Sequence, residues 1–298
     1  MSREICPRTG KPYGVERVCK TLGVARSTHY ARKARAECSP AAPPQKRGPK
    51  TAHSDDQVLA LIRNYLDISR FVMEGHRKVW ANFKFVLGLR IGKHRVLRIM
   101  RENQLLSPLR RPWREQKPHN GTILSARPNV LWGTDGTQVY TLEDGNVWIF
   151  GAIDHYSAEC VGVHVCKTGD RFAALEPISQ GILARFGSTN AQVAPGLSLR
   201  RDNGPQYTAK DFHQQIVYWG ITPSPALPYE PQTNGVIERF WRTLKDQCIH
   251  GRAFNTLEEV EGVVKAFVAN YNRLWRIERL GFKTPIEARL ASQLNPAA

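Results

Sequence analysis

From about residue 128 onwards the sequence alternates strand-forming runs with helical patterns, and this alternation constrains the fold more than any other feature. Apolar and β-branched residues predict strands over 130–139, 147–153 and 161–165, with a hairpin turn at 143–146 between the first two. A helix over 170–186, a short buried strand at 197–199, and helices over 209–219, 234–249 and 256–273 follow. This order predicts a mixed-sheet α/β domain, which we place at residues 128–290.

Three acidic residues stand at informative places in that pattern. Asp135 lies inside the first predicted strand, Asp202 directly follows the fourth, and Glu238 lies on a helix, with 35 residues between Asp202 and Glu238. An acid within a strand of the core is costly unless something neutralises it. Acids on neighbouring strands repel one another and favour a hard divalent cation, Mg²⁺ or Mn²⁺ rather than zinc. The three residues therefore predict a metal site for phosphodiester chemistry.

The helix that carries Glu238 supports this interpretation. Its apolar stripe, at helical spacing, consists of Ile237, Phe240, Trp241 and Leu244. Glu238, Arg242 and Lys245 form an adjacent row, so we expect one carboxylate for metal and two cations for DNA phosphate. A surface salt bridge between Glu238 and Arg242 would also explain this helix, but not the two aspartates.

Positive charge is concentrated at the front of the chain. Residues 1–118 hold 26 lysines and arginines against 9 acids, whereas residues 119–298 hold 17 of each. A basic region that carries periodic apolar residues is typical of a folded module that binds a polyanion. A basic solubilising tail is the alternative.

Two small helical modules make up this basic region. Residues 1–38 predict a helix-turn-helix, in which Arg26 and Ser27 stand near the start of the second helix, where side chains can reach DNA. Residues 54–106 predict a second DNA-binding helical module, with Arg95 and Arg98 on a basic helix. Basic, proline-containing linkers are predicted at 39–53 and 107–127. An ordinary helical hairpin would give the same apolar spacing.

Cysteine usage and hydropathy indicate the compartment. The six cysteines are scattered, which favours reduced thiols over a disulfide framework or a zinc site. No apolar run is long enough to cross a bilayer, and the N-terminus is not a signal peptide. We therefore expect a cytoplasmic protein without membrane partners.

The motifs around the three acids resemble the catalytic core of DDE transposases and retroviral integrases, and OrfB-type transposases of bacterial insertion sequences in particular. They are Trp132-x-x-Asp135-x-Thr137, Asp202-Asn203-Gly204-Pro205-Gln206-Tyr207, Asn234-Gly235-x-x-Glu238-Arg239-Phe240, Tyr271-Asn272 and Leu280-Gly281-Phe282-x-Thr284-Pro285. Leu22-Gly23-Val24-Ala25-Arg26-Ser27 and the segment 95–102 are similar to that family's helix-turn-helix segments.

This resemblance implies a ribonuclease-H-like fold and DNA cleavage and strand transfer at the ends of an insertion sequence. It also implies Mg²⁺, with Mn²⁺ as a substitute, held by Asp135, Asp202 and Glu238, and a contact between Lys245 and the DNA end. The implied partners are double-stranded DNA (terminal inverted repeats and target), further copies of the chain, and an upstream-frame OrfA-type protein. The implied location is the bacterial cytosol, in association with the nucleoid.

Two other functions stay open at this point. A ribonuclease-H-like nuclease would use the same three acids, because hydrolysis and strand transfer differ only in the nucleophile. A DNA-binding regulator with an inactive core is the other, although such a core has no chemical reason to retain all three acids and Lys245. The chain departs from the family pattern at Ile277, where a histidine is common, which leaves the role of the C-terminal segment open.

Overall fold

The computed structural model describes residues 3–37, 52–107, 125–225 and 234–294. The chain divides into two compact units, Met1–Ser54 and Asp55–Ala298. Most of the two predicted linkers, at 39–53 and 107–127, lies outside the described residues.

The first unit contains the predicted pair of helices, α1 (Val15–Thr21) and α2 (Arg26–Glu37). Gly23, in the turn between them, has φ +64°, a left-handed conformation that glycine adopts without strain. Cys19 is the one buried residue of α1, and α2 has none.

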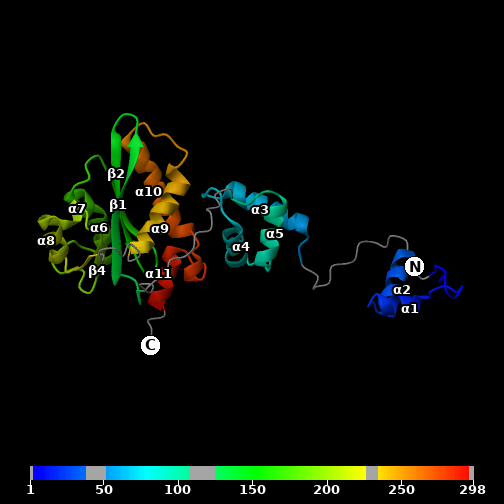
Figure 1. Ribbon diagram of the computed structural model, residues 1–298. Coiled ribbons are helices and arrows are strands. Elements are labelled where there is room, and N and C mark those ends of the chain that lie inside the picture. Colours follow the sequence, from blue (N-terminus) through cyan, green and yellow to red (C-terminus); the bar gives the residue numbers. More distant parts are fainter. Residues whose placement is uncertain (1–2, 38–51, 108–124, 226–233, 295–298) are drawn as a thin grey trace. The chain divides into compact units, whose positions relative to one another are not determined.

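The second unit begins with a helical module, labelled α3 (Asp55–Ile68), α4 (His76–Phe85) and α5 (Lys93–Glu102) in Figure 1. Its helices enclose a hydrophobic cluster of Val58, Ile62, Val79, Phe83, Ile91, Val96, Ile99 and Met100. The apolar stripes expected for α3 and α5 are therefore the residues that pack together.

Residues 71–80 of this module contact the C-terminal part of the same unit. The ring of Phe71 lies 4.8 Å from that of Trp275, and the ammonium group of Lys78 lies over the Trp275 ring. The side chain of Gln247 hydrogen-bonds to both the backbone N–H and the carbonyl of Val72, at 2.9 Å each. Trp275 belongs to the C-terminal segment, whose role was left open because Ile277 replaces a histidine that is common in the family. This segment therefore provides part of the surface that the helical module contacts.

The α/β domain is built on a five-stranded sheet with the strand order β3-β2-β1-β4-β5. The strands are β1 (Leu131–Thr141), β2 (Gly145–Asp154), β3 (Cys160–Cys166), β4 (Ser198–Arg201) and β5 (Thr222–Pro225). β1, β2 and β3 pair antiparallel, whereas β4 and β5 continue the sheet in parallel from β1. This is the ribonuclease-H-like arrangement that the sequence predicted. β5 was not predicted, because two of its four residues are prolines. Proline cannot donate a backbone hydrogen bond and occurs in sheets almost only on edge strands, as here.

Helices cover both faces of this sheet (Figure 1). On one face lie α6 (Arg171–Phe186), α7 (Pro205–Thr208) and α8 (Lys210–Tyr218). On the other lie α9 (Gly235–Leu244), α10 (Leu257–Leu274) and α11 (Pro285–Leu294). The predicted helix over 234–249 changes after Leu244 into a π-helical turn, η2 (Lys245–Ile249), and a short 3-10 turn, η3 (Glu278–Leu280), precedes α11. α11 itself was not predicted.

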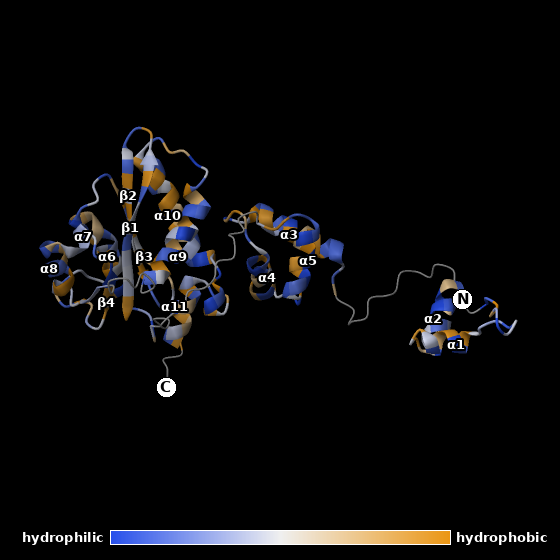
Figure 2. Ribbon diagram, in the orientation of Figure 1, coloured by the Kyte–Doolittle hydropathy of each residue, from blue (hydrophilic) through white to orange (hydrophobic). Residues whose placement is uncertain are grey.

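The alternation of side chains along β2 divides the core between the two faces. Ile149 and Ile153 point towards α9 and α10, whereas Phe150 and Ala152 point towards α6 and α8. Figure 2 shows hydrophilic and hydrophobic residues on different sides of the helices, as expected for helices that cover a sheet. Within the described residues, no helix has the length and apolar composition needed to span a membrane.

Candidate active site

Asp135 lies in the middle of β1, on the face covered by α9. Its register partner on β2 is Gly151. A Cβ at position 151 would lie 3.0 Å from the indole of Trp241, so this glycine lets Trp241 pack directly against the sheet beside Asp135. The strand position predicted for Asp135 is confirmed.

The carboxylate of Asp135 is partly desolvated and faces other acids. Its Oδ1 accepts a hydrogen bond from the backbone N–H of Gly136 at 2.8 Å. The pKa of Asp135 is raised to about 6, chiefly by burial and further by the negative charges of Asp202 and Glu238. The structure thus places Asp135 within reach of the charges of the other two predicted acids.

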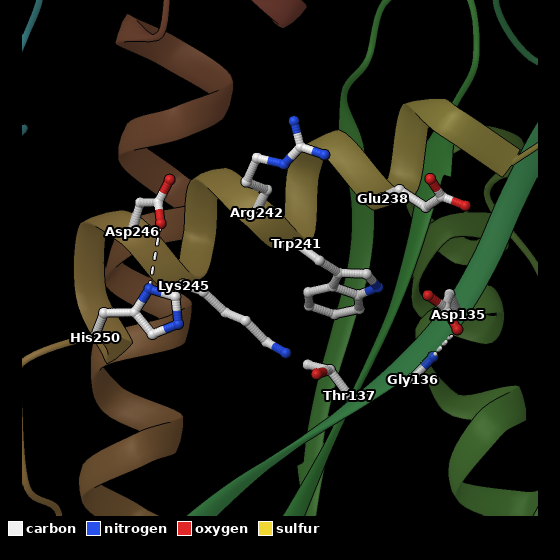
Figure 3. Close-up of a pocket in the computed structure, with 9 residues that line it drawn as sticks. All are labelled: Asp135, Gly136, Thr137, Glu238, Trp241, Arg242, Lys245, Asp246 and His250. Carbon is white, nitrogen blue, oxygen red and sulfur yellow. Dashed lines mark hydrogen bonds and ion pairs between the residues drawn. The ribbon is translucent and has the colours of Figure 1, made fainter. Parts of the chain in front are cut away.

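Glu238 lies in the first turn of α9, and its side chain is exposed. The predicted apolar stripe of this helix, which includes Phe240 and Leu244, is buried against the sheet and α10. In Figure 3 Glu238 extends from α9 above Asp135 on β1. Burial of the stripe therefore fixes the side of the helix on which Glu238 stands.

Asp202 follows the last residue of β4, the parallel neighbour of β1. It is exposed, and its Oδ1 accepts a hydrogen bond from the backbone N–H of Gly204 at 3.0 Å. Gly204 is the N-cap residue of α7, so the turn between β4 and α7 holds Asp202 in place.

A pocket of about 370 Å³ lies beside Asp135 and Glu238. Its lining includes Trp241, Arg242, Lys245, Asp246 and His250, all from α9 and the residues that follow it. Figure 3 shows Lys245 extending from η2 towards Thr137 on β1, with His250 paired to Asp246 at the far end. The structure thus places both predicted cations, Arg242 and Lys245, in the same pocket as two of the acids.

The donor types at the site fit a hard divalent cation. Carboxylate oxygens are the ligands that Mg²⁺ and Mn²⁺ prefer, and a cation bound here would offset both the burial of Asp135 and the repulsion from Asp202 and Glu238 that raise its pKa. Among the residues that the structure describes, however, no three acids, histidines or cysteines are placed to hold a metal ion. A metal would therefore have to draw these ligands closer together.

Two buried polar residues, Asn234 and His155, lie beside Gly133 on β1, and sequence reasoning assigned no role to either. Asn234, the N-cap residue of α9, donates to the carbonyl of Thr134 at 3.4 Å, and so connects the helix of Glu238 to the strand of Asp135. Gly133 leaves room for this contact, because a Cβ there would lie 2.6 Å from Asn234 Oδ1 and 2.8 Å from His155 Nε2. Asn234-Gly235 belongs to the motif around Glu238, but no pattern in the sequence points to His155.

The predicted DNA-binding residues of the helical modules have different surroundings. Arg26 and Ser27 are exposed at the start of α2, where Arg26 lies 3.5 Å from Glu16. Arg95 and Arg98 instead both bind the carboxylate of Asp55 at the start of α3. A DNA contact by these two arginines would compete with that ion pair.

Family models and curated relatives match most of the chain. Two integrase core domain models match residues 125–231 and 219–285, and an HTH-like domain model matches 53–113. The chain is 28% identical over 289 residues to the transposase for insertion sequence element IS629 of Shigella sonnei, which covers 94% of this chain and 92% of that protein. It is 26% identical over 248 residues to transposase InsD for insertion element IS2 of Escherichia coli, over 80% of this chain and 81% of that protein.

Similar solved structures are catalytic cores of retroviral integrases. The core of BIV integrase is 26% identical, with a TM-score of 0.42, over 56% of this chain and 98% of that one. The core of HTLV-2 integrase in complex with magnesium is 17% identical, with a TM-score of 0.41, over 55% and 98%. The two integrase core domain matches together extend over residues 125–285, and with the transposase relatives over most of the chain they are consistent with an insertion-sequence transposase of the DDE superfamily.

Proposed function

We propose that this protein cuts DNA at the ends of an insertion sequence and joins the freed ends to a target DNA. The observation that carries the proposal is the position of Asp135, a partly buried acid within β1 that experiences the charges of Asp202 and Glu238. The transposase relatives, which align over most of the chain, support the same activity.

Asp135, Asp202 and Glu238 are the proposed ligands of Mg²⁺, with Mn²⁺ as a substitute. When bound, the cation supplies activation of an attacking hydroxyl and stabilisation of charge on the departing oxygen. Asp135 is oriented by the backbone N–H of Gly136, which donates to its Oδ1. Trp241 excludes water from one side of this carboxylate by packing between α9 and the sheet.

The same pocket offers cations for the substrate. Lys245 and Arg242 line the same pocket as Asp135 and Glu238, so they are the proposed ligands of phosphates next to the reacting one. The proposed partners are double-stranded DNA, comprising the terminal inverted repeats and the target, and further copies of the chain, because two ends must be processed together. An upstream-frame OrfA-type protein is a further proposed partner, and the nucleoid of the bacterial cytosol is the proposed location.

The test uses the purified full chain and a labelled duplex of the DNA that flanks its own gene, in Mg²⁺ or Mn²⁺. We expect wild-type protein to give nicked and joined strands. Glu238→Gln should lower both products at least 100-fold, because it removes a ligand charge without changing the size of the side chain. Products are separated on denaturing gels.

Glu258→Gln is the matched control, since Glu258 lies in the first turn of α10, and it should retain wild-type activity. Nicking without joining would favour the nuclease over the transposase. Equal activity of Glu238→Gln and wild-type protein would contradict the assignment of the site.

A further inference from the structure

A second pocket, of about 450 Å³, lies beside the turn that follows β2 and shares no lining residue with the pocket described above. We call it the basic pocket. The turn after β2 contributes His155 and Tyr156, η3 and the residues after it contribute Arg279 and Lys283, and α11 contributes small side chains such as Ser292. No acidic residue occurs among the described residues that line it.

Arg279 is the unusual residue of the basic pocket. Its guanidinium donates to the backbone carbonyls of Tyr156 and His155, at 3.3 and 3.2 Å, and no carboxylate in the described part of the chain forms an ion pair with it. Other arginines nearby have such partners: Arg276 binds Glu287, and Arg185 and Arg289 share the buried Glu159. Arg279 therefore carries a charge that the protein leaves for something else to balance.

The acid that acts on Arg279 through space is Asp154, and this acid is already satisfied. Its oxygens accept hydrogen bonds from the backbone N–H groups of Asn129 and Ser157 and from the Ser157 hydroxyl. Arg279 remains accessible as a residue, although burial of its guanidinium lowers its pKa. An anion that enters the basic pocket can reach this group directly.

His155 lines the basic pocket and has ring nitrogens without hydrogen-bond partners among the described residues. Its side chain is 3% exposed, and neither ring nitrogen has a well-formed hydrogen bond to the described residues, although the Asn234 amide lies beside it. Burial and the charges of Arg200 and Arg279 lower the pKa of His155 to about 4. The ring is therefore neutral near pH 7, and one nitrogen remains a hydrogen-bond donor.

The basic pocket lies close to the reacting position. His155 Nε2 would be 2.8 Å from a Cβ at Gly133, and Gly133 precedes Asp135 by two residues on the same face of β1. Two residues of a strand span roughly 7 Å, and duplex DNA advances 3.4 Å per base pair. A backbone phosphate a few base pairs from the reacting one can therefore reach Arg279. Lys245 lies on the opposite side of the acids, beyond the C-terminal end of α9.

On these grounds we propose that the basic pocket binds a backbone phosphate of the DNA that crosses the active site, through Arg279 and Lys283. The proposal deepens the function proposed above and depends on it for the identity of the ligand. A strand-transfer enzyme holds two DNA molecules at one site, the element end and the target, and either can supply the phosphate.

The first test measures binding without chemistry. Arg279→Gln/Lys283→Gln is compared with wild type for binding of a fluorescent duplex in EDTA, over a series of salt concentrations. We expect a 5- to 20-fold weaker affinity, and a slope of log Kd against log salt that is smaller by about 1, the value for one lost phosphate contact. Lys210→Gln/Lys265→Gln, which removes the same charge from α8 and α10, should leave the slope unchanged.

Arg279 also holds the turn at residues 155–156, so its removal could disturb that turn. Lys283→Gln and Ser292→Asp therefore provide independent variants: the first removes an exposed charge, and the second introduces a carboxylate into the basic pocket. Each should weaken binding with an unchanged unfolding temperature. Wild-type affinity and slope in both would overturn the proposal.

The second test identifies the source of the phosphate. Loss of joining with normal end cleavage would assign the phosphate to the target, and an equal loss of both reactions would assign it to the element end. The binding assay contains no metal, so it tests phosphate binding by the basic pocket even if the wild-type protein does not cut DNA. A failure to cut DNA would count against the proposed function and not against the basic pocket.

Discussion

The two helical modules in the basic half of the chain are similar in sequence pattern and different in construction. α3, α4 and α5 bury a cluster of eight residues, including Phe83 and Met100 with no exposed surface. In the helices α1 and α2 only Cys19 is buried, and Val15 and Val18 are half-buried. Leu22, directly after α1, and Tyr30 on α2 are exposed. Apolar spacing shows that a helix has a preferred face, but not that something covers that face.

The difference indicates distinct roles for the two modules. Short helices are marginal in water unless tertiary packing supports them, so α2 needs a partner to hold its conformation. DNA is the partner that its exposed Arg26 and Ser27 suit. The second module has its own core and uses Arg95 and Arg98 internally, on Asp55. We expect bound DNA to stabilise the first module more than the second, which has its own core.

The largest expected effect that separates the modules comes from Phe83→Ala. Removal of a fully buried phenylalanine costs about 3–5 kcal/mol, through lost transfer energy and the cavity left behind. Tyr30→Ala on α2 removes a side chain that is 49% exposed and should change stability little. Urea unfolding, with hydrogen exchange resolved by segment, measures both. Similar losses in the two variants would mean that α2 is packed as tightly as α4.

A smaller effect is expected at Asp55, which binds both Arg95 and Arg98. Hydrogen bonds from Arg98 and Arg95 lower the pKa of Asp55, so its ion pairs stabilise the fold above its ordinary pKa of about 4 and are lost as pH falls through the lowered value. The groups are partly exposed, so the contribution is about 1 kcal/mol or less. Asp55→Asn should flatten the acid limb of the stability–pH curve.

The same variant tests whether Arg95 and Arg98 contribute to DNA binding. Asp55→Asn removes the negative charge that Arg95 and Arg98 share and leaves the Arg98–Glu102 ion pair in place, and it should strengthen non-specific duplex binding several-fold at low salt. Asp56→Asn, one residue further along the first turn of α3, is the matched control for loss of negative charge. Equal gains in both variants would indicate a general charge effect and remove Arg95 and Arg98 from the set of specific contacts.

Sequence patterns predicted the sheet and the positions of Asp135 and Glu238 on it better than they predicted what surrounds these acids. Asp135 was recognisable because an acid in an apolar strand has few explanations, and Glu238 because its helix has a clear apolar stripe. The edge strand β5 was not predicted because two of its four residues are prolines, which disfavour a strand. The basic pocket depends on residues 155 and 279, which are far apart in the sequence and meet only through the turn after β2 and the turn before α11. The contact of Trp275 with Phe71 is non-local in the same way.

The smallest expected change concerns Arg26→Gln, which separates binding from stability in the first module. Its ion pair with Glu16 spans 3.5 Å, and the side chains are 57% and 77% exposed, so its loss should leave the unfolding temperature unchanged. If α2 enters a DNA groove, the variant should bind terminal inverted repeats several-fold more weakly. Glu16→Gln removes the same pair and leaves Arg26 free, so it should bind at least as tightly as wild type. Equal weakening in both variants would show that the Arg26–Glu16 ion pair itself supports binding. A DNA contact by Arg26 would then be ruled out, and any stabilisation of α2 by DNA would depend on other residues.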